Sequence, residues 1–201
     1  MKKNNVSLYL NLLIIIFEIA AFTLNVIYGM GINAEFYTED SNLLLLISSL
    51  LFVIFTLYNK KIPKWLSILK YIATIGVTLT FVVVLFILAP MAGYNFKLFM
   101  FGGTLIFHHT LCPLLGAITF MLFDDLGEFN TKDIVLGLSF TIIYSIVLVI
   151  LNIIEVIEGP YPFLMVRSQS IIMSIIWILS IYFMAYFVAY IMRFIYIKKR
   201  S

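Results

Sequence analysis

The chain has 201 residues, of which 63% are hydrophobic and only 11% are charged, and its formal net charge is +3. A soluble domain of this size could not bury so much apolar surface, so the composition excludes a water-soluble protein and indicates that the solvent is lipid. The small positive charge comes from loop ends and indicates membrane topology rather than a nucleic-acid surface.

Apolar segments long enough to cross a bilayer, about 20 residues each, occur six times in the sequence. The predicted spans, in chain order, are residues 7–29, 38–58, 65–90, 99–123, 133–154 and 169–195. The first span is too long for a removable signal peptide and lacks its small-residue cleavage site, so we expect it to be retained. Because the spans use almost the whole chain, we predict a single all-α domain, residues 1–201, folded as a six-helix transmembrane bundle.

Lysine and arginine are distributed unequally between the two sides of this predicted bundle. With the N-terminus inside, the outer ends hold only Lys97 and Arg167. The cytoplasmic ends hold all other basic residues, namely Lys2, Lys3, Lys60, Lys61, Lys64, Lys70, Lys132, Arg193, Lys198, Lys199 and Arg200. Since loops rich in lysine and arginine are translocated poorly, both termini are predicted to face the cytoplasm. We expect a multi-pass protein of the cell membrane.

The first span carries Asn11, Glu18 and Asn25, which are seven residues apart and therefore share one helix face. Glu18 lies about 11 residues, or roughly 16 Å, into its helix, close to the membrane midplane. A carboxylate at that depth must be protonated or paired, and His108 or His109 is the obvious partner. Such a pair could tune a catalytic base, relay protons or simply lock two helices together.

The second span begins with a group of polar residues. Thr38, Ser41 and Asn42 share a face at positions i, i+3 and i+4. The adjacent Glu39-Asp40 pair is typical of a solvated helix entrance, where acidic residues are favoured by the helix dipole, and this interpretation is preferred to an ion- or substrate-contacting role.

The fourth span contains the only two histidines of the chain, His108 and His109, within the apolar run 98–123. Ionisable rings at such a position are costly unless they face a partner, a cavity or a substrate. Pro113 should bend the helix and free a backbone carbonyl beside the histidines. Cys112 is expected to be a packing residue. Neighbouring histidines point about 100° apart on a helix, and no metal-ligand spacing is present, so neither a metal nor another cofactor is expected.

A hydroxyl and an imidazole are the minimum for nucleophilic acyl chemistry, in which the base takes the proton of the weak nucleophile. No nucleophile motif such as G-x-S-x-G is present.

Three short motifs, in this order and at these span positions, resemble those of a known family. They are Phe36-Tyr37-Thr38 with Ser41-Asn42-Leu43, the run 109–115 (HTLCPLL) with Asp124 after it, and Tyr161-Pro162-Phe163-Leu164. The chain is similar over nearly its whole length to the androgen-induced-protein family of six-span membrane proteins and its bacterial relatives. The animal members are regarded as threonine hydrolases that cleave fatty acid esters of hydroxy fatty acids. The resemblance implies that Thr38 is the nucleophile, and that the histidine is His109 by the bacterial spacing or His108 by the animal spacing.

The leading hypothesis is therefore hydrolysis of lipid esters, with Thr38 attacking a carbonyl delivered from the outer leaflet and His109 acting as base. Ser41, Asn42, Glu18 and Tyr161 are the candidate substrate-binding or oxyanion-stabilising residues. Membrane lipids or lipid-like molecules are the expected partners; the sequence indicates no nucleic acid and identifies no protein partner.

Two alternatives remain open at this point. One is a small proton-coupled transporter that uses Glu18, His109 and the Glu39-Asp40 mouth. The other is a non-enzymatic membrane scaffold. The enzyme hypothesis also meets a difficulty of depth. Thr38 is near the outer surface, whereas His109 is about 10 residues, or roughly 15 Å, into its span. The two meet only if the fourth span begins later than predicted or the second begins earlier.

Overall fold

The computed structural model describes residues 3–200, with side chains from residue 5 onward. Across these residues the regular secondary structure is entirely helical, and six helices are long and apolar enough to cross a membrane, with mean hydropathies of 1.6 to 2.7. The spans are Asn5–Ile27, Tyr37–Leu57, Lys64–Met91, Ile106–Phe123, Lys132–Ile153 and Ile171–Lys198. The predicted all-α, six-span architecture of a multi-pass membrane protein is confirmed.

Helices are the expected solution, because a chain in hydrocarbon must satisfy every backbone hydrogen bond internally. The α-helices are α1 (Lys3–Ile27), α2 (Tyr37–Leu57), α3 (Lys64–Val83), α4 (Ala89–Met91), α5 (Phe96–Phe101), α6 (Cys112–Ile118), α7 (Lys132–Gly137), α8 (Ser139–Ile153) and α9 (Ile171–Lys198). Three wide π-helical turns lie in two of the spans: Val84–Leu88 in the third, and Phe107–Leu111 and Thr119–Phe123 in the fourth. Short 3₁₀ turns at Pro162–Leu164 and Val166–Ser168 lie between α8 and α9.

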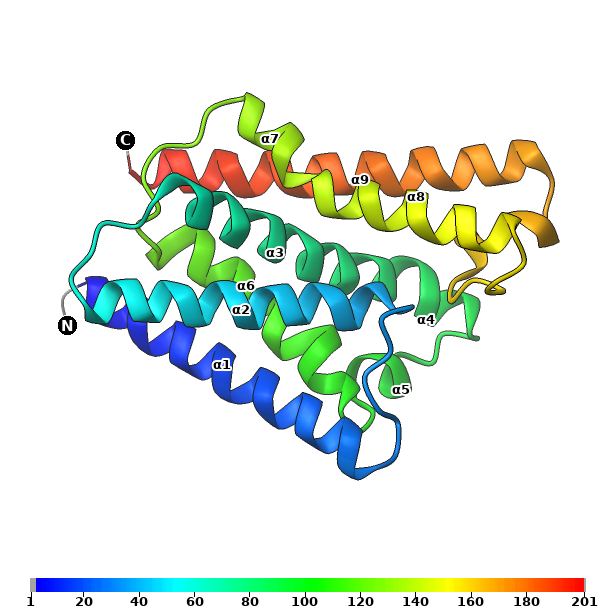
Figure 1. Cartoon of the computed structure of the whole chain (residues 1–201), viewed down its shortest axis with the longest axis horizontal. Coiled ribbons are helices and arrows are strands. Elements are labelled where there is room, and N and C mark those ends of the chain that lie inside the picture. The colour runs from blue at the N-terminus through cyan, green and yellow to red at the C-terminus, as the bar shows by residue number, and fades with distance from the viewer. Residues whose placement is uncertain (1–2, 201) are drawn as a thin grey trace.

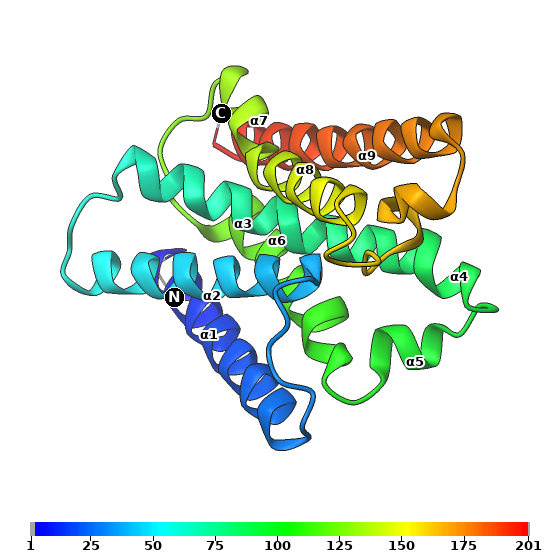
Figure 2. The ribbon, with the colours of Figure 1, turned by 45° about the vertical axis from the view of Figure 1, so that its right-hand side comes forward.

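Helix α3 lies at the centre of the bundle. It packs against α2, α6 and α9, and its span is the most buried of the six, at 56%. Figure 1 shows α1 and α2 on one side of α3 and the α8–α9 pair on the other. Both termini lie at one end of the bundle, called here the terminal end, and α4 and α5 lie at the opposite end (Figures 1 and 2).

The burial pattern is the reverse of that in a soluble protein. On α1, Asn11 and Glu18 have no exposed surface, whereas Ile16 and Ile19 are 60% and 53% exposed. Only 22% of the α9 span is buried, and aromatic side chains such as Phe183 cover its outer face. Polar groups therefore hold the helices together inside the bundle, while apolar side chains face lipid.

The charged side chains follow the predicted asymmetry, with one exception. The α2–α3 connection, with Lys60 and Lys61, and the start of α7 at Lys132 lie at the terminal end, whereas α5, with Lys97, and the 3₁₀ turn with Arg167 lie at the opposite end. Lys2 lies outside the described residues.

Lys70, which was expected among the basic residues of the cytoplasmic end, is instead buried completely inside the bundle. Its ammonium donates hydrogen bonds of 2.6 Å to the side-chain oxygens of Asn11 and Ser49. Its burial was not predicted, because hydropathy identifies a lysine near a helix end but does not show which face of the helix it occupies.

The fourth span begins later than the predicted residue 99. Helix α5 is a separate short helix, and the span itself runs over Ile106–Phe123. Two glycines cause the break: the Gly102 N–H closes α5 by donating to Leu98 O at 2.9 Å, and Gly103 adopts a φ of 54°, which glycine accepts without strain. The apolar sequence is continuous through this break, so hydropathy alone did not reveal it.

Close contact between α2 and α3 depends on Gly76. A Cβ built there would lie 3.0 Å from Ser41 Cβ, an atom that cannot move away without its backbone. At Gly116 the nearest atoms, on Leu45, would be 3.4 Å away, an ordinary contact. Both substitutions to alanine gain similar helix propensity. A difference in stability between the two variants therefore reports the difference in packing.

We expect Gly76→Ala to be less stable than Gly116→Ala by about 1–3 kcal/mol, the usual cost of overpacking. Denaturant unfolding of the two variants in the same detergent measures the difference. Equal stabilities would show that α2 and α3 are not in close contact at Gly76.

Candidate active site

Helix α2 begins at Tyr37 and places Thr38 in its first turn, at the opposite end of the bundle. Tyr37 fixes this helix start, because its hydroxyl makes a 2.7 Å hydrogen bond with the hydroxyl of Thr141 on α8. Thr38 itself is largely buried, and its carbonyl accepts hydrogen bonds from Ser41 and Asn42, at 3.1 and 2.8 Å. The three residues predicted to share a face therefore do so.

The wide turn Phe107–Leu111 carries both histidines. In this turn the Cys112 N–H donates to Phe107 O, five residues earlier. The next carbonyl, that of His108, would need the N–H of residue 113, which is a proline and has none. The carbonyl that Pro113 frees is thus the carbonyl of His108, in agreement with the expected effect of the proline.

Asn42 satisfies this freed carbonyl and joins the two predicted parts of the site. Its side-chain nitrogen donates both to Thr38 O, at 2.8 Å, and to His108 O, at 3.2 Å. The two oxygens therefore lie no more than 6.0 Å apart, the sum of these distances. The late start of the fourth span removes the difficulty of depth, since His108 is the third residue of the span Ile106–Phe123.

A cavity of about 750 Å³ opens beside this link. Its polar lining consists of Asn25, Asn33, Thr38, Glu39, Thr104, His108, His109 and Tyr161. Apolar side chains including Leu88, Met91 and Phe99 complete the wall. Thr38, both histidines and Tyr161, which lie far apart in the sequence, therefore line one cavity.

Glu39 turns toward this cavity rather than toward open solvent. Its Oε1 accepts a 2.9 Å hydrogen bond from the side chain of Asn25, on α1. This contact differs from the solvated helix entrance that we preferred for the Glu39-Asp40 pair. Asp40 is not among the residues that line the cavity.

The expected contact between Glu18 and a histidine is present, and the histidine is His108. Its Nε2 lies 3.3 Å from Glu18 Oε2, and the two side chains are 2% and 0% exposed. The ring of Phe22 packs on the imidazole with a centroid separation of 4.8 Å. Glu18 itself lies behind the histidine and does not line the cavity.

His109 has a different partner. Its Nδ1 lies 2.6 Å from the carbonyl of Phe99, and the hydroxyl of the next residue, Thr110, donates to Met100 O at 2.7 Å. These carbonyls belong to the last turn of α5, which lacks intrahelical donors. The two side chains therefore cap α5. Because a carbonyl only accepts, the Nδ1 of His109 must carry the proton, which leaves a lone pair on Nε2.

Tyr161 reaches the cavity from the loop after α8. Its ring stacks on Phe163, at 5.0 Å, and its hydroxyl interacts with the hydroxyl of Thr38. Burial raises the pKa of Tyr161 to about 12. Its phenol is therefore neutral at physiological pH and remains a hydrogen-bond donor beside Thr38.

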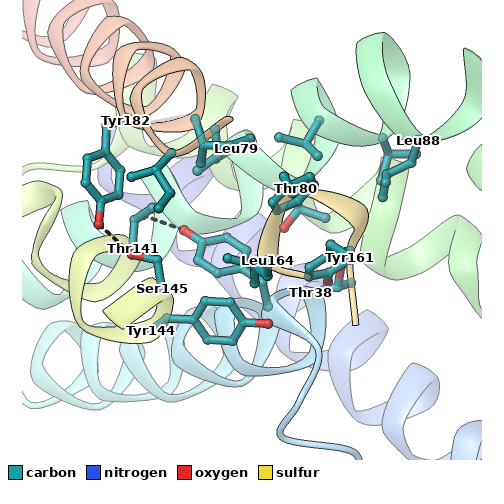
Figure 3. A pocket seen from close by; sticks show the side chains of 16 residues that line it. Thr38, Leu79, Thr80, Leu88, Thr141, Tyr144, Ser145, Tyr161, Leu164 and Tyr182 are labelled. Atoms are coloured by element: carbon teal, nitrogen blue, oxygen red, sulfur yellow. Dashed lines mark hydrogen bonds between the residues drawn. The ribbon is translucent and has the colours of Figure 1, made fainter. Parts of the chain in front are cut away.

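A second, narrower cavity of about 50 Å³ meets the first at Thr38, Leu88 and Tyr161, which line both. Figure 3 shows Thr38 beside Tyr161, with Leu79, Leu164 and other side chains of α3, α8, α9 and the loop around the cavity. Most of its wall is apolar, apart from hydroxyl groups such as Ser145, which makes a 2.6 Å hydrogen bond with Tyr182.

Ser41 and Asn42, proposed from the sequence as substrate-binding residues, lie behind Thr38 and do not line the wider cavity. Their hydrogen bonds position Thr38 and the His108 backbone instead. The role of Tyr37 was not predicted, although Thr141 and Ser145, four residues apart on the fifth span, could have indicated a polar helix face there.

Within the described part of the chain, no three His, Cys, Asp or Glu side chains are grouped to hold a metal ion. Cys112 is fully buried in an apolar cluster with Ile14 and Leu45. No family model, curated protein sequence or solved structure matches the chain.

The Asn42 link can be tested by Asn42→Leu, which keeps the branching of the side chain but leaves the buried His108 carbonyl without its donor and Thr38 O with Ser41 as its remaining side-chain donor. We expect a loss of about 1–3 kcal/mol of unfolding free energy, the cost of unsatisfied buried groups. Ser48→Ala is the matched control, because Ser48 is also fully buried on α2 but bonds only within its own helix, to Leu45 O. Chemical unfolding in detergent measures the unfolding free energy of both variants. Equal losses in Asn42→Leu and Ser48→Ala would contradict the bridging role of Asn42.

Proposed function

We propose that this protein hydrolyses carboxylic esters of membrane lipids, with Thr38 as nucleophile and His109 as general base. The observation that carries the proposal is the position of Thr38, which lines both a polar cavity with two imidazoles and a narrow, mostly apolar cavity. A fatty ester has this dual character, since a polar ester group is attached to an apolar chain. The resemblance to the androgen-induced-protein family, in which Thr38 matches the nucleophile, supports the same assignment.

In the proposed reaction, Thr38 Oγ1 attacks the ester carbonyl while His109 Nε2 takes the hydroxyl proton. The tetrahedral intermediate collapses, the C–O bond of the ester breaks, and the imidazolium returns its proton to the leaving alcohol. Water, deprotonated by the same nitrogen, then attacks the acyl-threonine and releases the carboxylic acid. Tyr161, a neutral phenol next to Thr38, is a suitable donor to the oxyanion.

The proposed setting is the bacterial plasma membrane, with both termini in the cytoplasm. The bundle supports this orientation by its charge distribution, because the basic residues of its loops lie mainly at the terminal end. The cavity would then face the outer leaflet, from which lipid esters would enter.

Proton-coupled transport is the second candidate, and one observation favours it. Another cavity, of about 660 Å³, lies at the terminal end, lined by residues that include Asn5, Lys60 and Asp125. Against transport, packed apolar side chains, among them Ile14 and Val77, separate the polar groups of the two ends. Uptake into proteoliposomes driven by a pH gradient, and unaffected by Thr38→Ala, would favour transport over hydrolysis. A scaffold role has less support, because the interior is not tightly filled.

Hydrolysis should require the Thr38 hydroxyl. We expect Thr38→Ala to lower the hydrolysis of a fluorogenic long-chain ester by at least about 1,000-fold, the effect of removing a nucleophile, and to abolish labelling by a fluorophosphonate probe. Thr56→Ala, at the other end of the same helix, should keep ester hydrolysis and probe labelling within twofold of the unsubstituted protein. Full activity of a folded Thr38→Ala protein in nanodiscs would rule out the proposed nucleophile.

A further inference from the structure

The two histidines have partners of different chemistry, and this difference suggests different roles. His109 Nδ1 faces a neutral backbone carbonyl, at 2.6 Å, whereas His108 Nε2 faces a carboxylate, at 3.3 Å. Both partners are acceptors when Glu18 is ionised, but only the carboxylate can also hold a proton. The proton content of the His108 ring therefore depends on Glu18.

Two buried basic groups interact with Glu18, namely His108 in direct contact and Lys70 at longer range. Lys70, the nearest buried cation on α3, is bridged to Asp124 by Asn11, whose amide bonds Lys70 at 2.6 Å and Asp124 at 2.8 Å. Lys70 and Asp124 thus offset each other at the terminal side of the bundle. Lys70 interacts more strongly with Asp124 than with Glu18, and His109 is committed to Phe99, so His108 is the main partner of Glu18 among the described residues.

A net-neutral Glu18–His108 pair is strongly favoured over a negative one, because an uncompensated charge in an apolar interior is costly. An ionised Glu18 beside a neutral His108 has a net charge of −1. The pair becomes neutral when it gains one proton. That proton can be on Glu18 or on His108 Nε2. In both arrangements the other ring nitrogen, Nδ1, carries a hydrogen.

Other titratable groups around the pair do not reverse this conclusion. Glu39 on α2 interacts electrostatically with both members, and its negative charge favours a proton on the pair. The thiol of Cys112 lies beside Glu18, and His109 is the adjacent ring. The negative charge of Glu39 therefore reinforces the preference for a net-neutral pair.

From this arrangement we infer that Glu18 holds His108 in a form whose Nδ1–H donates a hydrogen bond into the cavity, to the carbonyl oxygen of the bound ester. His108 lines the cavity, and its Nε2 is directed at Glu18, so Nδ1 is the polar atom available to a ligand. His109 presents a lone pair to the same cavity. One imidazole thus accepts the proton of Thr38 while its neighbour stabilises the oxyanion. Glu18 is a positioning residue that acts through His108. This inference rests on the proposed function for the identity of the hydrogen-bonded substrate atom.

The test uses nitrogen NMR of the full chain, labelled with ¹⁵N-histidine and reconstituted in nanodiscs at pH 7. The chain has two histidines, so His108→Gln identifies the signals of each ring. We expect His108 Nδ1 of the unsubstituted protein to resonate as a protonated nitrogen. Glu18→Gln should change the Nε2 signal of His108, because the amide can hydrogen-bond Nε2 as donor or acceptor but cannot transfer a proton to it. Glu18→Asp should keep the protonated signal, and Ser7→Ala, on the same face of α1, should change neither ring.

The kinetic counterpart is a fall in kcat of about 100-fold in His108→Phe, the effect of losing one oxyanion donor, while Glu18→Asp should retain activity. An unprotonated His108 Nδ1 in the unsubstituted protein would overturn the inference, even if Glu18→Gln fails to fold. A Glu18→Gln spectrum identical to that of the unsubstituted protein would also overturn it. If the spectra behave as expected while the unsubstituted protein does not hydrolyse the ester, the pair is as inferred and the hydrolase assignment alone is wrong.

Discussion

The need to pair polar and charged groups inside a lipid-solvated bundle determines this structure. Lys70, Glu18 and Asp124 have no exposed surface, and unpaired charges there would cost far more than a protein of this size can tolerate. Each is therefore held by a group on another helix, and the contacts run along the inner face of α1 from Ser7 to Asn25. These contacts fix the position of α1 against α3, α6 and the start of α2.

The site arises where this pairing meets a proline. Pro113 deprives the His108 carbonyl of its helical donor, and Asn42 supplies one while also bonding the carbonyl of Thr38. A local defect in one helix is thus converted into a contact between two helices. Functional sites in membrane bundles often form where irregular backbone lines a cavity, because the protein rather than lipid then satisfies the freed groups. Here the consequence is a hydroxyl, two imidazoles and a phenol around one cavity.

The sequence predicted the six spans, the buried stripe of α1 and the Glu18–histidine contact, because each depends on strong signals: hydropathy, periodicity and the cost of a buried charge. It did not predict that Lys70 is buried, since helix position alone does not reveal a partner such as Asn11. It also missed the break at Gly102 and Gly103, where hydropathy is continuous but the backbone turns. The partners of the two histidines came from tertiary contacts between α1, α5 and the wide turn, which no local pattern contains.

Proximity of Thr38 to the histidine turn is the claim on which the site depends, and cross-linking in membranes tests it most directly. In a Cys112→Ser background, Thr38→Cys combined with His108→Cys should be joined in high yield by a short bifunctional thiol reagent, with the linked peptides identified by mass spectrometry. Thr56→Cys with His108→Cys is the matched pair from the same helix and should give almost no product. Equal yields from the two pairs would contradict a shared cavity and the function inferred from it.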